Sequence, residues 1–570
     1  MRTATGDRAR DVLRGAGLLA ALALSGVSIL DPDLPWHLSA ARRLVETRAL
    51  PRADFLSWTM GGKPWVDFEW GSELAFYGLE RMGGSAALWL FRSAALFGLT
   101  LAFLGLLRLW KLPKIWEALA APALAGALFP LFGLRPEIFS LLLFMLEFHL
   151  LERRRTGRLK IGAGRFALLH AGLYAAWANL HAGFPAGLLL CACYGLGEMF
   201  SRPEETVPLS FLAAGAGLAG TLATPYGPGL YAVLFEHWRH VGSLRRLITE
   251  WNAPTFFQAY LTGYWLILVA AFAGLLAASV RGQSLPAEHV AVVVAFAFFG
   301  SRAIRGTPYA ILTAAPLGLW AWSRLSLPPI SRRPLLLAAL VAAVVVPWRG
   351  YHWARDMRFF GWPEPLAAQG PSRAVEFLRR EKAVLAGLKM YNSYNWGGIL
   401  GYGLFPDYKV FIDGRYLFAD LLAEVDAAQD SPRSFRSFID RYGVALAVQP
   451  NDGLMLRDPS DPSSLSARPY LAAAWPRAQW ALVYWDSDAV VLVRRSAVPA
   501  GWLARREFRC LRPHDLRQIG LYVVGGALRL QDVEAEIARY RREIGDPRES
   551  AELESWFERF RGNFPAPRRR

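Results

Sequence analysis

The chain has 570 residues, of which 54% are hydrophobic and 13% aromatic. Soluble domains hold about 45–50% apolar residues with glycine included, so an excess concentrated before Trp348 excludes an entirely soluble protein. The net charge of +17 does not indicate nucleic-acid binding, because most Lys and Arg before Trp348 lie in short clusters between apolar runs.

About eleven apolar runs are candidates for membrane helices, with roughly 17–25 residues as the guide and shorter runs accepted. The first, 12–30, lacks a convincing cleavage site and is predicted to be an uncleaved anchor. Basic clusters precede the first run and follow the second, fourth and tenth, which predicts a cytoplasmic N-terminus and an external C-terminal part. The remaining runs cover 86–109, 115–132, 138–151, 166–180, 184–200, 207–223, 259–280, 287–300, 307–322 and 334–348.

Acidic residues follow the first run. Unpaired carboxylates are costly in the hydrocarbon core of a membrane. We therefore expect Asp31 and Asp33 at the membrane surface or in a polar cavity. Either carboxylate could act as a general base or hold a metal ion, alone or with His37. The alternative is a pair that caps a helix and starts the long first outer loop, 31–85.

Two arginines, Arg302 and Arg305, fall between the ninth and tenth runs, on the predicted outer side. Their position breaks the positive-inside pattern, and binding of a phosphate-bearing ligand would explain it. The alternatives are contact with lipid headgroups or pairing with Glu137 or Glu250. Arg135 has the same two interpretations, with Glu137 as its expected partner.

Further polar residues are predicted on the same outer side. His181 ends the fifth run, and a histidine there serves in capping or packing as well as in catalysis. Tyr226 lies between the seventh and eighth runs, whereas Asp67 and Glu69 belong to the first outer loop.

After Trp348 the pattern changes to alternating helices and strands, which predicts an external α/β domain over 349–500 and a charged helical extension over 501–570. Asp413-Gly414-Arg415 is interpreted as a turn after a buried strand. The expected helices are 372–381, 435–442, 532–544 and 551–560, and the expected strands are 409–413, 444–449, 481–484 and 489–494, the last two forming a hairpin.

An ordered series of short motifs resembles bacterial membrane proteins of the GT-C glycosyltransferase superfamily. The series includes Asp31-Pro-Asp-Leu-Pro-Trp-His-Leu and Gly62-Lys-Pro-Trp-Val-Asp-Phe-Glu-Trp. It continues through Leu134-Arg-Pro-Glu-Ile-Phe, Trp177-Ala-Asn-Leu-His-Ala-Gly-Phe and Ile248-Thr-Glu-Trp to Val410-Phe-Ile-Asp-Gly-Arg, so it covers most of the chain. The chain departs from the common pattern at Lys63-Pro64-Trp65 and in having Asp-x-Asp.

The resemblance implies a mainly α fold: a polytopic helical bundle of GT-C type with the α/β domain outside, in a bacterial cytoplasmic membrane. It also implies inverting transfer of a hexose or pentose from a polyprenyl-phosphate donor to a glycan, lipid or protein acceptor. By this resemblance Asp33 is the base beside Asp31, with a divalent cation such as Mg²⁺ or Mn²⁺ at the pair. The resemblance also implies that Asp67 or Glu69 orients the acceptor and that Arg302 and Arg305 hold the donor phosphate. His37, Arg135, His181 and Tyr226 are further candidate substrate-binding residues because of their predicted position on the outer side.

Two other functions fit a polytopic membrane protein. A transporter or flippase would place ionisable residues at mid-membrane and show two matching halves, and no convincing internal repeat is present. A non-catalytic scaffold for envelope assembly would use its C-terminal part for binding alone.

Overall fold

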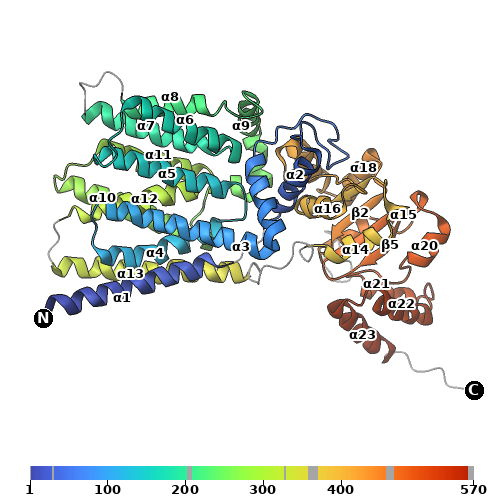
Figure 1. Ribbon diagram of the computed structural model, residues 1–570. Coiled ribbons are helices and arrows are strands. Elements are labelled where there is room, and N and C mark those ends of the chain that lie inside the picture. Colours follow the sequence, from blue (N-terminus) through green and yellow to red (C-terminus); the bar gives the residue numbers. More distant parts are fainter. Residues whose placement is uncertain are drawn as a thin grey trace, which may run out of the picture. The chain divides into compact units, whose positions relative to one another are not determined.

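Apolar helices make up the first of two units into which the chain divides (Figure 1). The computed structural model describes residues 2–27, 31–201, 208–325, 329–356, 370–456 and 468–562. The helical unit comprises Met1–Leu34, Ala40–Arg52 and Val66–Glu364. The C-terminal unit comprises Pro35–Ser39, Ala53–Trp65 and Pro365–Arg570.

Each of the eleven predicted runs overlaps a helix of the helical unit. The helix α9 lies in a segment that the sequence analysis treated only as a connection, and α2 lies in the first outer loop. In chain order the helices are α1 (Arg2–Ser25), α2 (Leu34–Thr47), α3 (Trp70–Leu109), α4 (Lys114–Leu128), α5 (Glu137–Arg155), α6 (Ala163–Leu180), α7 (Phe184–Ser201), α8 (Leu209–Gly220), α9 (Gly229–Leu247), α10 (Thr262–Val280), α11 (Ala287–Arg302), α12 (Thr307–Ser323) and α13 (Pro329–Asp356).

The long helix α3 is two helices joined at a kink. Gly83 and Gly84 have non-helical backbone angles, and the positive φ of Gly84 is readily available only to glycine. The kink lies just before the start of the predicted apolar run 86–109, so the first part of α3 belongs to the first outer loop.

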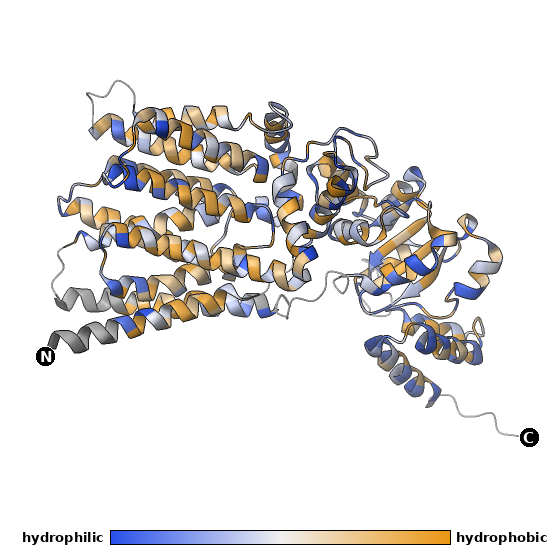
Figure 2. Cartoon of the chain, viewed as in Figure 1, coloured by the Kyte–Doolittle hydropathy of each residue, from blue (hydrophilic) through white to orange (hydrophobic). Residues whose placement is uncertain are grey.

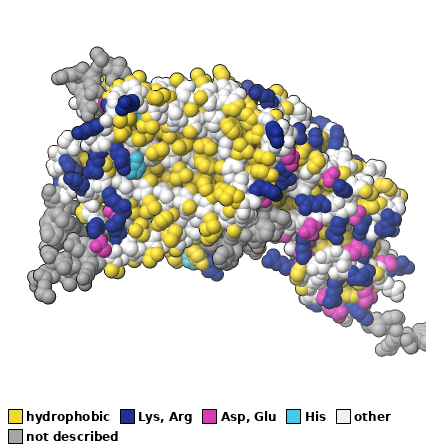
Figure 3. Space-filling model, viewed as in Figure 1, with side chains coloured by type: hydrophobic (Ala, Val, Ile, Leu, Met, Phe, Trp, Pro, Cys, Tyr) yellow, Lys and Arg dark blue, Asp and Glu magenta, His cyan; other side chains and the backbone are white. Residues whose placement is uncertain are grey.

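The helical unit exposes apolar side chains to its surroundings. Val269 and Leu276 on α10 are 62% and 66% exposed, and Phe298 on α11 is 66% exposed. Hydrophobic residues dominate these helices, and hydrophobic side chains form a broad band on the visible face (Figures 2 and 3). Water would disfavour so large an apolar surface, so the protein is a membrane protein.

Three helical segments of the described residues are long and apolar enough to cross a membrane: Trp70–Leu109, Phe184–Ser201 and Ala259–Val280. The predicted count of eleven spans is therefore not confirmed. The helices of this unit pack side by side: α1 and α13 contact α4, α6 contacts α8, and α10 contacts α12.

The C-terminal unit is built on a four-stranded sheet in the order β1-β2-β6-β5. The strands are β1 (Met390–Asn392), β2 (Leu446–Pro450), β5 (Trp480–Trp485) and β6 (Ala489–Arg494). β1 and β2 are parallel and the other neighbours are antiparallel, which confirms the predicted 481–494 hairpin. A second, two-stranded sheet pairs β3 (Met455–Leu456) with β4 (Arg468–Pro469).

Helices cover both faces of the four-stranded sheet, so its strands are apolar on both sides. Val490 and Leu492 of β6 enter one hydrophobic core, and Val491 and Val493 enter the other. The helices are α14 (Ser372–Arg380), α15 (Lys382–Leu385), α16 (Gly397–Leu404), α17 (Ala419–Ala428), α18 (Pro432–Tyr442), α19 (Tyr470–Ala474), α20 (Ala500–Arg506), α21 (Leu516–Val524), α22 (Leu530–Glu543) and α23 (Pro547–Gly562).

The predicted strand 409–413 is wrong. Only Val410 forms a bridge, with Ser57 of the first outer loop. The Asn392 side chain supplies the other partners: its Oδ1 accepts from the Phe411 N–H at 2.7 Å, and its Nδ2 donates to the Ile412 carbonyl at 2.8 Å. The Asn392 side chain therefore takes the place of a neighbouring strand as the hydrogen-bond partner of this segment. The alternation of apolar and polar residues in a sequence does not reveal such a partner.

Candidate functional site

Loops at one end of the helical unit bring ionisable side chains together. Asp31 follows α1, Arg135 precedes α5, Glu250 lies in a 3₁₀ turn after α9, and Arg305 lies in another before α12. Contacts among these four residues place them at the same end of the helical unit. The sequence analysis expected all four on one side of the membrane. We call Asp31, Asp33, Arg135, Glu250 and Arg305 the acid–arginine cluster.

Arg135 is the centre of this cluster. Its Nε donates to Asp31, and its Nη1 donates to both carboxylate oxygens of Glu250, at 2.7 and 2.6 Å. Its Nη2 lies 3.6 Å from the Asp33 carboxylate. The partners of Arg135 are therefore Asp31 and Glu250, whereas the sequence analysis expected Glu137.

The two aspartates differ in exposure. The Asp31 side chain is 3% exposed, and its Oδ1 accepts a hydrogen bond from the Asp33 N–H at 3.0 Å. Burial raises the pKa of Asp31 to about 6, against the opposing effect of Arg135. The Asp33 side chain is 22% exposed and lies farther from Arg135. Asp31 is thus held in place, whereas Asp33 is accessible to a ligand.

Glu250 connects the two arginines. The Nε of Arg305 donates to Glu250 at 3.0 Å, and the Arg305 guanidinium lies 5.2 Å from the centre of the Trp251 ring. Burial opposes ionisation, but Arg135 and Arg305 outweigh it and lower the pKa of Glu250 to about 2. Arg302 is exposed, and its backbone carbonyl accepts from Arg245. Arg305 therefore belongs to the acid–arginine cluster, whereas Arg302 lies on the surface.

Glu69 and His181 form a neighbouring pair. The Gly183 N–H donates to His181 Nδ1 at 3.0 Å, so the ring proton resides on Nε2, which lies 3.6 Å from Glu69. Burial and the nearby Asp67 raise the pKa of Glu69 to about 8. Burial and Arg305 lower the pKa of His181 to about 3, so the imidazole is neutral at pH 7.

Three other predicted site residues are Tyr226, Asp67 and His37. Tyr226 donates its hydroxyl proton to the Pro51 carbonyl at 3.1 Å, which fastens the first outer loop. Asp67 is buried in the helical unit. His37 belongs to the C-terminal unit, where its ring centroid lies 3.5 Å from that of Trp36.

Arg92 supports the loop of the acidic pair, and the sequence analysis missed it. This buried guanidinium donates to the carbonyls of Phe132 at 2.7 Å and of Ser25 and Phe129 at 3.1 Å. It joins the end of α1 to the segment before Arg135. An arginine in the first third of the apolar run 86–109, far from its basic end, was the available signal, because such residues rarely occur without a function.

Gly133 permits the close approach of Asp31. A Cβ atom at position 133 would collide with the Asp31 carboxylate, so a side chain here would displace one member of the cluster. The acidic pair therefore depends on a glycine as well as on its ionic partners.

The carboxylate oxygens of the cluster suit a hard divalent cation such as Mg²⁺ or Mn²⁺. Asp33 and Glu69 lie close enough to interact electrostatically, and burial leaves Glu69 protonated. A bound cation stabilises the ionised form of a buried acid, so Glu69 could lose its proton and become a ligand. On the Asp31 side, the guanidinium of Arg135 already supplies positive charge.

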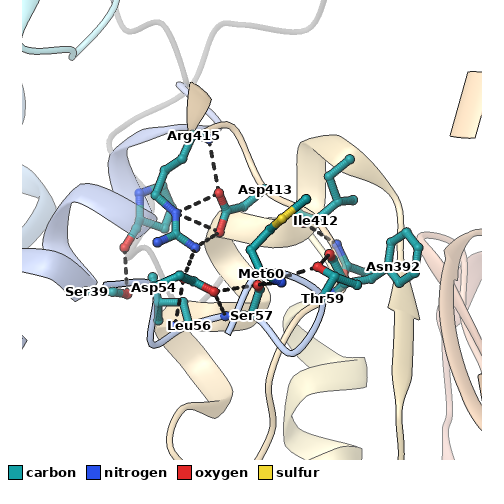
Figure 4. A network of polar contacts seen from close by, with 12 residues as sticks. Ser39, Asp54, Leu56, Ser57, Thr59, Met60, Asn392, Ile412, Asp413 and Arg415 are labelled. Atoms are coloured by element: carbon teal, nitrogen blue, oxygen red, sulfur yellow. Dashed lines mark hydrogen bonds and ion pairs between the residues drawn. The ribbon is translucent and has the colours of Figure 1, made fainter. Parts of the chain in front are cut away.

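The Asp-Gly-Arg turn forms a buried network in the C-terminal unit (Figure 4). Arg415 donates from Nε and Nη2 to Asp413, and its Nη2 also lies 2.7 Å from Asp54. Asp54 in turn binds the Ser57 backbone and hydroxyl. The network fastens residues 53–65 to the rest of the unit, which favours the interpretation of the motif as a structural turn.

We expect Arg415→Ala to lower the stability of the C-terminal unit by about 3–5 kcal/mol, because two buried carboxylates lose their partner. Thermal unfolding of the full chain, followed by limited proteolysis of that unit, measures the change. Arg441→Ala is the matched control, since the Arg441 side chain is 61% exposed and an exposed pair contributes about 0–1 kcal/mol. Equal effects of the two variants would contradict a structural role for the turn.

Comparisons with known proteins identify the fold. No protein-family model and no curated protein sequence matches the chain. The archaeal oligosaccharyltransferase AglB from Archaeoglobus fulgidus, solved in complex with an inhibitory peptide and a dolichol-phosphate, is similar at a TM-score of 0.51 and 11% identity. The match covers 94% of this chain and 86% of the oligosaccharyltransferase. The chain therefore has the GT-C fold that its motifs resemble.

Two further solved structures show weaker similarity. Arabinofuranosyltransferase AftD from Mycobacteria has a TM-score of 0.48 and 15% identity, and the match covers 85% of this chain and 41% of that protein. ArnT from Cupriavidus metallidurans, bound to undecaprenyl phosphate, has a TM-score of 0.44 and 14% identity, with coverage of 84% and 97%.

Proposed function

We propose that this membrane protein of GT-C fold transfers a sugar from a polyprenyl-phosphate donor to an acceptor hydroxyl or amide on the external face of a bacterial cytoplasmic membrane. The observation that carries the proposal is the acid–arginine cluster: an accessible carboxylate and an accessible guanidinium lie in one network at one end of the helical unit. A proton acceptor and a phosphate-binding group are the two functions that such a transfer needs.

Asp33 is the proposed general base. Its carboxylate takes the proton from the acceptor as the acceptor atom forms a bond to the anomeric carbon, and the bond from that carbon to the phosphate oxygen breaks. Asp31 positions this group, because its Oδ1 holds the Asp33 backbone and its Oδ2 holds Arg135. Direct displacement of this kind inverts the anomeric configuration.

Arg305 is the proposed ligand of the donor phosphate. Its Nε donates to Glu250 at 3.0 Å while the side chain is 39% exposed, so part of the guanidinium is accessible to a ligand. A guanidinium forms charge-assisted, often bidentate, hydrogen bonds to phosphate and stabilises the charge that accumulates as the leaving group departs. Arg302 lies three residues before Arg305 and is exposed. It is the proposed contact for phosphate or for lipid headgroups outside the acid–arginine cluster.

Asp33 and Glu69 are the proposed ligands of a Mg²⁺ or Mn²⁺ ion, because the two carboxyl groups interact electrostatically. Bound there, the ion would supply further positive charge to the donor phosphate. Asp31, which the resemblance paired with Asp33 at the cation, is held by Arg135 instead. The Nε2 of His181 lies 3.6 Å from the Glu69 carboxyl group, so we propose that this imidazole borders the ion site.

Binding of Mn²⁺ is expected to strengthen with pH. The pKa of Glu69 is about 8 without a cation, so below pH 8 the ion must displace a proton, and its affinity falls about tenfold for each pH unit. Titration of the purified protein with Mn²⁺ at pH 6.5 and 8.5 measures the difference. In Glu69→Gln the affinity should be lower and nearly independent of pH over this range; an unchanged pH dependence would remove Glu69 from the ligand set.

The test of the proposed function is release of free polyprenyl phosphate. Purified protein in liposomes is incubated with polyprenyl-phosphate-linked sugars extracted from bacterial membranes, together with a membrane fraction as the source of acceptor, and the lipid products are identified by mass spectrometry. Enzyme-dependent formation of polyprenyl phosphate, coupled to glycosylation of an acceptor, supports transfer. Movement of the intact sugar-linked lipid between leaflets without its cleavage would instead indicate a flippase.

A further inference from the structure

A second group of reactive side chains lies inside the helical unit. Glu147 on α5, His170 on α6 and Cys191 on α7 are fully buried, and one potential ligand atom from each lies within 4.8 Å of the others. Glu147 follows Glu137 by ten residues, which is about 15 Å along α5. We propose that these three residues form a Zn²⁺ site that joins α5, α6 and α7 at this depth.

The tautomer of His170 prepares it for a metal. Its Nδ1 lies 2.7 Å from the Phe166 carbonyl, and because a carbonyl only accepts, Nδ1 carries the proton. In the neutral imidazole, Nε2 then carries the lone pair, and it lies 3.2 Å from Glu147 Oε1. Metal-binding histidines are oriented in this way, with the second nitrogen donating to a backbone carbonyl.

The group needs a positive charge between its members. Among the described residues, His170 Nε2 and Glu147 Oε2 are buried without a hydrogen-bond partner. Cys191 Sγ donates to Glu147 Oε1 at 2.7 Å, so a cation that displaces the thiol proton would have a ligand atom from each of the three residues within reach. Three lone-pair donors that face one another are stabilised by a cation placed between them.

The charge of the proposed complex suits its surroundings. A thiolate, a carboxylate and a neutral imidazole carry two negative charges, which one Zn²⁺ neutralises, and a neutral complex avoids the cost of an uncompensated charge among apolar helices. Cysteine and histidine ligands select Zn²⁺ over Mg²⁺ or Mn²⁺. The Tyr174 hydroxyl lies 3.8 Å from Cys191 Sγ, so a further polar group borders the proposed site.

Metal content tests this site without reference to activity. The full-length protein is produced in medium supplemented with Zn²⁺, purified in detergent, treated briefly with a chelator and analysed by elemental mass spectrometry. We expect a stoichiometric amount of zinc in the wild type and in Cys193→Ser, which changes the neighbouring buried cysteine of α7. Cys191→Ser and His170→Gln should lose at least about tenfold in affinity.

Cobalt gives a second measurement on the wild type, so the test does not depend on whether the variants fold. Protein produced with Co²⁺ should show sulfur-to-cobalt charge-transfer absorption, which Cys193→Ser retains. Wild-type protein without zinc and without this absorption would overturn the proposal and leave a His170–Glu147 ion pair. Zinc that persists in Cys191→Ser would overturn it as well. Asp33→Asn should keep its zinc, because that residue belongs to the other cluster.

Discussion

Replacing Asp33 with Asn is expected to reduce sugar transfer by about 10²- to 10⁴-fold, the contribution typical of a general base. The amide has nearly the same shape as the carboxylate but does not accept the proton of the incoming nucleophile. Because the Asp33 side chain is partly exposed and lies 3.6 Å from Arg135, the change should leave the fold intact. Formation of polyprenyl phosphate, followed over time in liposomes, measures the loss.

The matched control for this variant is Asp11→Asn. The Asp11 side chain is 54% exposed and binds Lys114 away from the acid–arginine cluster. Its transfer rate should equal that of the wild type. If Asp33→Asn transferred sugar at the wild-type rate, Asp33 would not be the base, whereas loss of donor binding in the same variant would indicate a role in binding.

Replacing Arg135 with Ala is expected to lower the free energy of unfolding of the helical unit by about 3–5 kcal/mol and to abolish transfer. The substitution removes the partner of Asp31 and one of the two partners of Glu250. Asp31 would then be a buried carboxylate without a compensating charge, which favours its protonation, whereas Glu250 keeps Arg305. Thermal unfolding in detergent measures the stability, and the liposome assay measures the transfer.

A double variant separates these effects. Arg135→Ala with Asp31→Asn removes a buried charge along with its partner, so it should recover part of the lost stability but none of the transfer. Arg239→Ala on α9 is the control, because its side chain is 61% exposed and its ion pair is long, at 3.8 Å. Wild-type stability in Arg135→Ala would contradict the assignment of Arg135 as the centre of the cluster.

The sequence predicted much of the fold and the end of the bundle at which the ionisable residues lie. Apolar runs predicted the helices because a membrane domain needs long apolar segments, and basic clusters indicated which loops share a side. Asp31, Arg135 and Arg305 were therefore expected on one side, and the structure brings them into one network.

The sequence analysis named Glu250 as a possible partner of Arg305, which the structure confirms, but it did not predict the partners of Arg135. Arg135 was expected to bind Glu137, two residues away, but it binds Asp31 and Glu250, which lie far from it in the chain. Which loops meet depends on helix packing, and Arg92 and Gly133 set the local approach. In the C-terminal unit, the same limitation hid the pairing of Asn392 with residues 411–412.

The most direct test of the central claim is native mass spectrometry of the purified protein with polyprenyl phosphate. The wild type should retain the lipid, and Arg305→Ala should bind it about 10- to 100-fold more weakly, because a charge-assisted hydrogen bond contributes about 1.5–3 kcal/mol. Arg281→Ala, an exposed arginine after α10, should bind as the wild type does. Absence of binding to the wild type with the lipid in excess, or equal binding by Arg305→Ala, would contradict a donor-phosphate site at the acid–arginine cluster.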